Sequence, residues 1–223
     1  MRILAALSIL MLSTAAAFAG DDAVTHHFAA SVARGGIQRV VVEIPAGQIS
    51  IRNGGTGTIT VNGEVRRSFD GHHERVRAQR IVDDVSAEII VRGNEAIVRR
   101  HFGPNAQSWS AKSFHSGLEI QLEVPPGVDL LLMTRFGEID VDGAFGNIDA
   151  DLTAGEIHVR TPRAGTREVN ASVRIGEVHG NAGGELIEKE GLFPRALYYV
   201  NAGGKGDINL HSTFGEVHVT LTR

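Results

Sequence analysis

The sequence contains no cysteine and few aromatic residues, and each shortage excludes a class of protein. Without cysteine there can be no disulfide framework, no cysteine-type zinc site, no thiol nucleophile and no lipid on an N-terminal cysteine. Lys and Arg number 22 against 26 Asp and Glu. The resulting formal net charge of −4 gives no electrostatic support for a nucleic-acid partner. Aromatic residues make up 5% of the chain, so few side chains can stack on sugars.

What is present is typical of a globular protein. The chain has 223 residues, of which 42% are hydrophobic and 22% charged, and it includes 27 glycines. That length suits one domain of ordinary size or two small ones, with a well-buried core, and that composition argues against wholesale disorder, collagen or a polytopic membrane protein. We therefore expect one folded domain rich in turns.

The N-terminus has the pattern of a secretory signal peptide. Arg2 precedes an apolar run over residues 3–12, and small residues follow up to Ala17-Phe18-Ala19. A retained membrane anchor is the alternative, but the run falls far short of the ~20 residues that span a bilayer. We expect cleavage after Ala19 and export to the periplasm or the medium. The mature domain, residues 20–223, would then carry no transmembrane segment.

Apolar and polar residues alternate over short stretches of the chain, as at residues 118–124. A period of two is typical of strands with one buried face. Gly or Pro closes nearly every stretch, which predicts short strands separated by turns. One segment, residues 74–85, instead has apolar residues at helical spacing and is predicted to form a short helix.

Beyond residue 130 a triplet recurs in which Gly is followed by an acid or amide and then by Ile or Val. It occurs at residues 137–139, 146–148, 155–157, 176–178, 206–208 and 215–217. The spacing indicates units of about ten residues, two to each turn of a flattened β-solenoid of about 20 residues per turn. Equivalent points on successive coils would be Gly137, Gly155, Gly176, Ala196 and Gly215, with each glycine at a corner of positive φ. An antiparallel sandwich with evenly spaced hairpins is the alternative.

Four segments together resemble the bacterial putative adhesin family. They are Gln48-Ile-Ser-Ile after Gly47, and residues 123–130 (EVPPGVDL), 134–141 (TRFGEIDV) and 155–159 (GEIHV). The resemblance implies an exported β-repeat domain of unknown function with a right-handed β-solenoid or β-roll fold. The resemblance implies no catalytic residue. The predicted fold is therefore all-β, with an irregular part at residues 24–128 that contains hairpins and a regular solenoid at residues 129–223. Residues 163–197, where the glycine signature thins out, depart from the pattern.

The repeat predicts which side chains of the C-terminal strands face inward and which face outward. The expected inward residues are Ile139, Val141, Ile157, Val159, Val178, Tyr198, Val200, Val217 and Val219. One outward column would hold Glu138, Glu156, Glu177, Leu197 and Glu216, and the next would hold Asp140, His158, His179, Tyr199 and His218. In that order His158 and His179 are neighbours, flanked by Glu156 and Glu177.

These four residues are the candidate metal ligands. Two imidazoles beside carboxylates can bind zinc or another divalent cation, or respond to acid. The alternative is a solvated face whose polar side chains keep the sheet soluble.

Trp109 is the other candidate site residue. It is the only tryptophan, and it lies in a polar, irregular stretch between residues 99 and 115. A long loop with a Trp suits a binding surface, whereas a Trp that caps an open solenoid end is the alternative. Phe136, Phe145 and Phe214 stand beside repeat glycines, where we expect them to pack at corners.

These patterns favour an exported, non-enzymatic surface-interaction module of the cell envelope. Its expected partner is a protein or glycan of the envelope, with no nucleic acid and no cofactor. One alternative is an envelope sensor or regulator that responds to pH or divalent metal through the His and Glu columns. A second is a glycan-active β-helix enzyme with paired acids in a groove. The sequence leaves the identity of the partner and the oligomeric state open.

Overall fold

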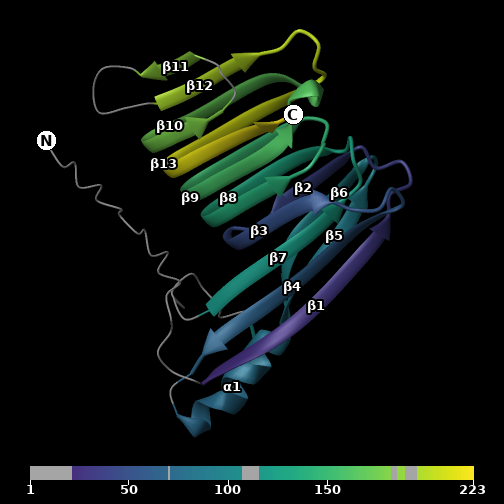
Figure 1. Cartoon of the computed structure of the whole chain (residues 1–223). Coiled ribbons are helices and arrows are strands. Elements are labelled where there is room, and N and C mark those ends of the chain that lie inside the picture. Colours follow the sequence, from purple (N-terminus) through teal and green to yellow (C-terminus); the bar gives the residue numbers. More distant parts are fainter. Residues whose placement is uncertain (1–21, 70, 107–115, 182–184, 189–194) are drawn as a thin grey trace, which may run out of the picture.

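The structure is a computed structural model that describes residues 22–69, 71–106, 116–181, 185–188 and 195–223 (Figure 1). The described strands are β1 (Ala23–Ala33), β2 (Arg39–Glu43), β3 (Ala46–Asn53), β4 (Thr58–Ser68), β5 (Val85–Arg92), β6 (Glu95–Phe102), β7 (Ser116–Val124), β8 (Asp129–Asp142), β9 (Ile148–Pro162), β10 (Thr166–Gly180), β11 (Glu185–Glu188), β12 (Arg195–Val200) and β13 (Gly206–Thr222). The α-helix α1 spans His72–Asp83, and a short 3-10 helix η1 spans Arg163–Gly165. The all-β prediction is confirmed, and so is the helix, which begins and ends two residues earlier than expected. Residues 1–19, which are predicted to form a signal peptide, and Trp109 lie outside the described residues.

All the described strands belong to one open sheet. Its main path runs β1-β4-β7-β3-β8-β9-β13-β10-β12-β11, and β2, β5 and β6 branch from it through the pairing of β2 with β8. From β7 to β10 the neighbours are parallel, whereas the pairs towards both ends are antiparallel. The parallel part therefore combines β3 and β7, which precede residue 129, with the C-terminal repeat.

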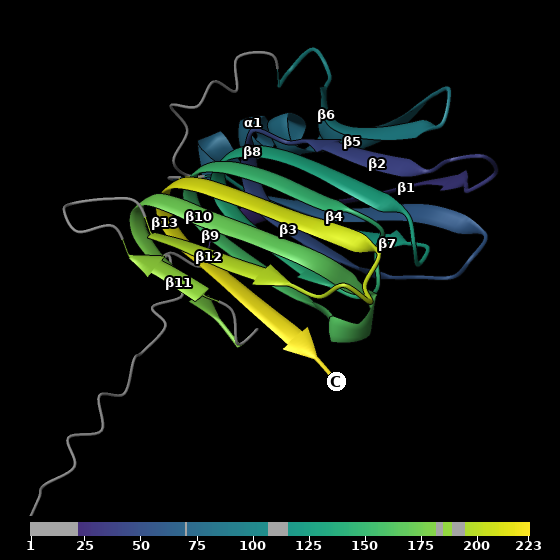
Figure 2. The same cartoon turned by 90° about the horizontal axis from the view of Figure 1, so that it is seen from above.

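The long strands bend at a column of glycines. Gly47, Gly137, Gly155, Gly215 and Gly176 are paired in that order across β3, β8, β9, β13 and β10. All five have positive φ, between 129° and 146°, so the predicted glycine corner is confirmed for the four that belong to the repeat. On each side of the bend every second residue is buried, but across the bend this alternation shifts by one residue. In β9, for example, Leu152 and Ile157 are both buried although they are five positions apart. Both halves of a strand can therefore face the same interior, and Figure 2 shows these strands curving over.

The strands are longer than the sequence predicts for the same reason. β8, β9, β10 and β13 contain 14, 15, 15 and 17 residues. Because the pairing keeps the same register on both sides of the glycine bend, two short predicted strands become one. The expectation of short strands is wrong in this part of the chain.

Branched aliphatic side chains fill the interior in rows that cross the sheet. One row consists of Ile120, Ile49, Ile139, Ile157, Val217 and Val178, paired in that order on β7, β3, β8, β9, β13 and β10. Every member is at most 5% exposed. At about 1.5–3 kcal/mol for each fully buried side chain, such rows supply much of the stability of the sheet.

The helix lies at the end of the sheet formed by β1 and β4, opposite the end formed by β12 and β11. Helix α1 packs against β1, β4 and β5 and buries Ala78 and Val82 (Figure 1). Within the described residues no helix is both long and apolar enough to cross a membrane.

The order of the last strands differs from the expected order. β13 lies between β9 and β10 and is parallel to both, whereas the repeat predicts β9 next to β10. β12 is antiparallel to β10, and its Ala196 pairs with Ser172. Ala196 therefore has no place in the glycine column.

The register of β12 against β10 also reverses the expected faces of β12, because Leu197 pairs with the buried Ala171. Tyr198 and Val200 are exposed and Leu197 is buried, the opposite of the prediction. The expected inward residues of β8, β9, β10 and β13 are buried as predicted.

Candidate functional site

Three neighbouring strands carry the same tetrapeptide on the outer face of the sheet. It reads Gly-Glu-Ile-His at residues 155–158 of β9, and Gly-Glu-Val-His at residues 215–218 of β13 and 176–179 of β10. Strand pairing aligns the three segments residue by residue. Because side chains alternate along a strand, the Ile or Val points into the core while the Glu and His point out. We call this outward set, Glu156, His158, Glu216, His218, Glu177 and His179, the Glu-His ladder.

The three imidazoles of the ladder form a stack. The ring centroids of His158 and His218 are 4.6 Å apart with 6° between the ring planes, and those of His218 and His179 are 4.7 Å apart with 22° between the planes. These separations match the spacing of neighbouring strands, so the backbone pairing sets the stack.

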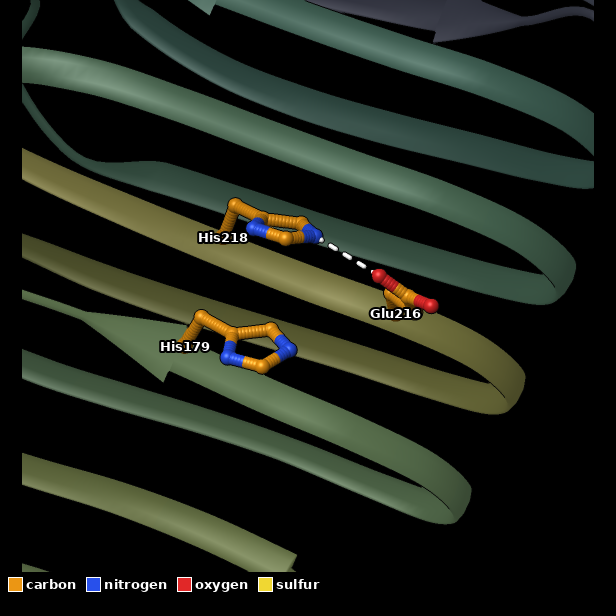
Figure 3. Close-up of side chains that lie close together, drawn as sticks. All are labelled: His179, Glu216 and His218. Atoms are coloured by element: carbon orange, nitrogen blue, oxygen red, sulfur yellow. Dashed lines mark hydrogen bonds and ion pairs between the residues drawn. The ribbon is translucent and has the colours of Figure 1, made fainter. Parts of the chain in front are cut away.

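Each imidazole also lies against the glutamate two residues before it. The Nε2 atoms of His158 and His218 are 3.0 Å from a carboxylate oxygen of Glu156 and Glu216, and that of His179 is 3.1 Å from Glu177. Figure 3 shows the His218–Glu216 pair beside His179. The imidazole side chains are 33–48% exposed, so they line a surface and not a closed cavity.

The polar face of the ladder continues onto β8 and β3. Asp140 pairs with His158, and Glu138 pairs with Glu156. On β3, Gln48 donates a 2.6 Å hydrogen bond to Glu138. Partial burial raises the pKa of Asp140, and the nearby Glu138 carboxylate raises this pKa further. A face that holds so many carboxylates has a negative potential that attracts cations.

The structure brings Glu156, His158, Glu177 and His179 onto one face, as the sequence predicts, but not into the expected order. His158 and His179 are not neighbours, because β13 places His218 between them. Leu197 is buried and lies outside the glutamate column.

Two groups of these side chains have the composition of a metal site. The potential ligand atoms of His179, Glu216 and His218 lie within 4.8 Å of one another, and the same holds for Glu138, Glu156 and His158. The first group has two imidazoles and one carboxylate, and the second has one imidazole and two carboxylates. A shallow hollow of about 240 Å³ lies beside the ladder, and its lining includes Asp140, His158 and His218.

An apolar ridge runs along the outside of the bend, next to the ladder. Phe136, Ala154, Phe214 and Ile175 precede the four repeat glycines and are paired in that order across β8, β9, β13 and β10. Phe136 is 54% exposed, Phe214 47% and Ile175 36%. We call these four residues the corner ridge.

The exposure of the corner ridge corrects one sequence expectation. Phe136 and Phe214 were expected to pack at corners, and of the three phenylalanines only Phe145 packs against the core. The slip in alternation at each glycine turns the preceding side chain outward. A hydrophobic residue precedes each of Gly137, Gly155, Gly176 and Gly215, but Phe145 precedes Gly146 in the same way and packs against the core, so this signal alone does not predict exposure.

No family model matches the chain, and no curated protein matches it. Among solved structures, the chain aligns with a putative cell adhesion protein from Clostridium sporogenes at 13% identity and a TM-score of 0.47, over 89% of this chain and 100% of the other. It aligns with a putative adhesin from Parabacteroides distasonis at 12% identity and a TM-score of 0.29, over 90% and 71% of the two chains. A third, a putative adhesin from Bacteroides fragilis, gives 8% identity and a TM-score of 0.26, over 91% and 98%. Likenesses at these TM-scores establish neither fold nor function for this chain.

Proposed function

We propose that the protein is an exported, non-enzymatic surface-interaction module of the putative adhesin type, with a parallel part wound as a β-roll. Its binding surface is the outer face that carries the corner ridge and the Glu-His ladder. The observation that carries the proposal is the corner ridge, in which two half-exposed phenylalanines and an isoleucine are aligned by strand pairing beside a polar face.

An ordered apolar stripe of this kind suits binding. Single exposed hydrophobic residues are normal on protein surfaces, but contiguous apolar patches with polar rims are characteristic of interaction sites. Aromatic side chains are also enriched where proteins contact partners, because they bury a large area at a small entropic cost. Phe136 and Phe214 occupy equivalent positions on β8 and β13, with only the small Ala154 of β9 between them.

The ladder beside the ridge suits binding better than catalysis. Each of its three strands presents the same Glu and His to solvent, 3.0–3.1 Å apart. A catalytic site normally places different groups around one enclosed substrate, whereas a repeated face offers the same contact several times. The partner that we propose is a protein or glycan of the cell envelope, which the exported domain would meet there.

The proposal is tested by binding of the labelled mature domain, residues 20–223, to whole cells of the producing species. We expect saturable binding that falls at least about tenfold in the double variant Phe136→Ser, Phe214→Ser, because contacts of buried aromatic residues commonly dominate an interface. Val91→Ser is the matched control, since Val91 is 46% exposed on β5, away from the corner ridge.

Pretreatment of the cells identifies the partner class. Loss of binding after periodate oxidation would indicate a glycan, and loss after protease treatment would indicate a protein. Absence of saturable binding, or equal binding by the double variant and the parent protein, would contradict the proposed surface.

A further inference from the structure

We propose that His179, His218 and Glu216 form a binding site for one divalent transition-metal ion of the zinc class. The site lies on two neighbouring strands, β10 and β13, within the Glu-His ladder, and metal binding there does not require a partner at the corner ridge. Figure 3 shows the two imidazoles projecting from the sheet in the same direction, with the carboxylate of Glu216 beside them.

The backbone holds the three side chains within reach of one ion. His179 and His218 are directly paired residues of parallel strands, and their ring centroids are 4.7 Å apart. Glu216 Oε2 is already 3.0 Å from His218 Nε2, and all three potential ligand atoms lie within 4.8 Å of one another. In a tetrahedral zinc site with bonds of about 2.0–2.1 Å, two ligand atoms stand roughly 3.3 Å apart. The stacked rings direct their Nε2 atoms side by side, each towards its own glutamate, so both imidazoles must turn to share one ion. Their partial exposure leaves room for this rotation, and the strand pairing keeps the two side chains within reach of each other.

The donor atoms select the class of metal. Two imidazole nitrogens and one carboxylate oxygen suit Zn²⁺ and its neighbours Co²⁺, Ni²⁺ and Cu²⁺. Ca²⁺ and Mg²⁺ are poor occupants, because they require about six or more oxygen ligands. Three protein ligands also leave one coordination position for water or for a group from another molecule.

The surrounding charge favours a cation at this point. Glu177 lies 3.1 Å from His179, and further along the ladder Glu156 and Glu138 continue the same column. A divalent ion bound by the imidazole nitrogens would compensate the negative charge of these carboxylates. The neighbouring group of Glu138, Glu156 and His158 has a single imidazole, so we expect it to bind zinc-class metals more weakly.

The test is calorimetric titration of ZnCl₂ into the untagged, chelator-treated mature domain, residues 20–223. We expect one ion per chain at the tighter site, and an affinity at least about 100-fold lower in His179→Ala and in His218→Ala, since even residues that only orient ligands contribute 10–100-fold. Glu216→Gln preserves the size of the side chain and removes the charge, so it should also weaken binding. Titration with Co²⁺ should give the visible absorption of a tetrahedral nitrogen and oxygen site.

Two further histidine variants make the test specific. His211 is an exposed histidine on the same strand as His218, where it contacts Ser172 Oγ at 3.1 Å, so His211→Ala should bind zinc like the parent protein. His158→Ala should retain the tight site, because His158 does not belong to it. No heat change up to ~1 mM zinc, or an equal loss of affinity in His211→Ala and His218→Ala, would overturn the proposal. Unfolding curves check that every variant is folded.

Discussion

Gly155 shows how a single residue sets the shape of the sheet. Its φ is 135°, and a β-carbon at this position would lie 1.8 Å from the carbonyl oxygen of Gly137 on the neighbouring strand. Gly137, Gly176 and Gly215 make equally close approaches to the glycine of the next strand. The bend therefore requires glycine at every step, both for the backbone angle and for the space.

Replacement of Gly155 by alanine should be strongly destabilising. We expect Gly155→Ala to lower the free energy of unfolding by at least about 1–3 kcal/mol, the usual cost of a sparsely populated backbone conformation, and the steric clash should add to this. Urea unfolding followed by circular dichroism measures the loss. Gly165→Ala is the control, because Gly165 has no positive φ and no atom near its β-carbon position. Equal unfolding midpoints for the two variants would contradict the role of the glycine column.

Asp140 gives a prediction on pH dependence. Partial burial and the nearby Glu138 raise its pKa in the folded state, so folding favours the protonated form. The stabilising contribution of protonated Asp140 is present at low pH and is lost as pH rises through the folded-state pKa. Asp140→Asn should therefore raise the melting temperature slightly at pH 7, and this gain should shrink as the pH falls towards 4. A variant that is less stable than the parent at pH 7 would show that the charge of Asp140 is stabilising. Chelator in the buffer keeps metal out of the comparison.

The two faces of each repeat were predictable from the sequence, because period two assigns alternate residues to opposite sides. Ile139, Ile157 and Val217 are buried, and Glu156 and His158 face outward, as the pattern predicts. The exposure of Phe136 was not predictable in this way. It follows from the slip in alternation at the glycine, and the sequence pattern alone does not place that slip.

At the scale of the strands, the buried rows should behave as one packed unit. Ile157 is fully buried on β9, between Ile139 on β8 and Val217 on β13. We expect Ile157→Ala to cost about 2–5 kcal/mol of unfolding free energy, through lost burial and the cavity that remains. Thr153→Ala, an exposed change on the same strand, should cost less than about 1 kcal/mol. A similar small loss for both variants in urea unfolding would mean that the row is not packed as described.

The order of the strands was only partly predictable. Local repeats indicate which segments are equivalent, but they carry no information on which equivalent segments become neighbours. In the structure β13 lies between β9 and β10. This order and the sequential order β9-β10-β13 would bury Ile157, Val178 and Val217 equally well, so the alternation does not distinguish them. The observed site therefore differs from the predicted one, because the neighbour of His179 is His218 and not His158.

At the scale of the whole molecule, the expected destination is outside the cytoplasm. The segment up to Ala19 should be removed during export, leaving a mature protein that begins at Gly20. Mass spectrometry of the protein recovered from periplasmic and extracellular fractions of the producing species checks this. An intact N-terminus on protein from the cytoplasm alone would contradict the proposed export and, with it, an envelope partner.

The central claim is that β13 separates β9 from β10 and so assembles the Glu-His ladder. Because the chain has no cysteine, pairs of introduced cysteines test this order directly. Neighbouring strands are about 4.8 Å apart, within reach of a disulfide, whereas a second neighbour lies at roughly twice that distance and beyond the ~7 Å limit. Under mild oxidation with chelator present, His158→Cys, His218→Cys should form an intramolecular disulfide detectable by mass spectrometry, and His158→Cys, His179→Cys should remain reduced. The opposite result would place β10 next to β9 and contradict the account.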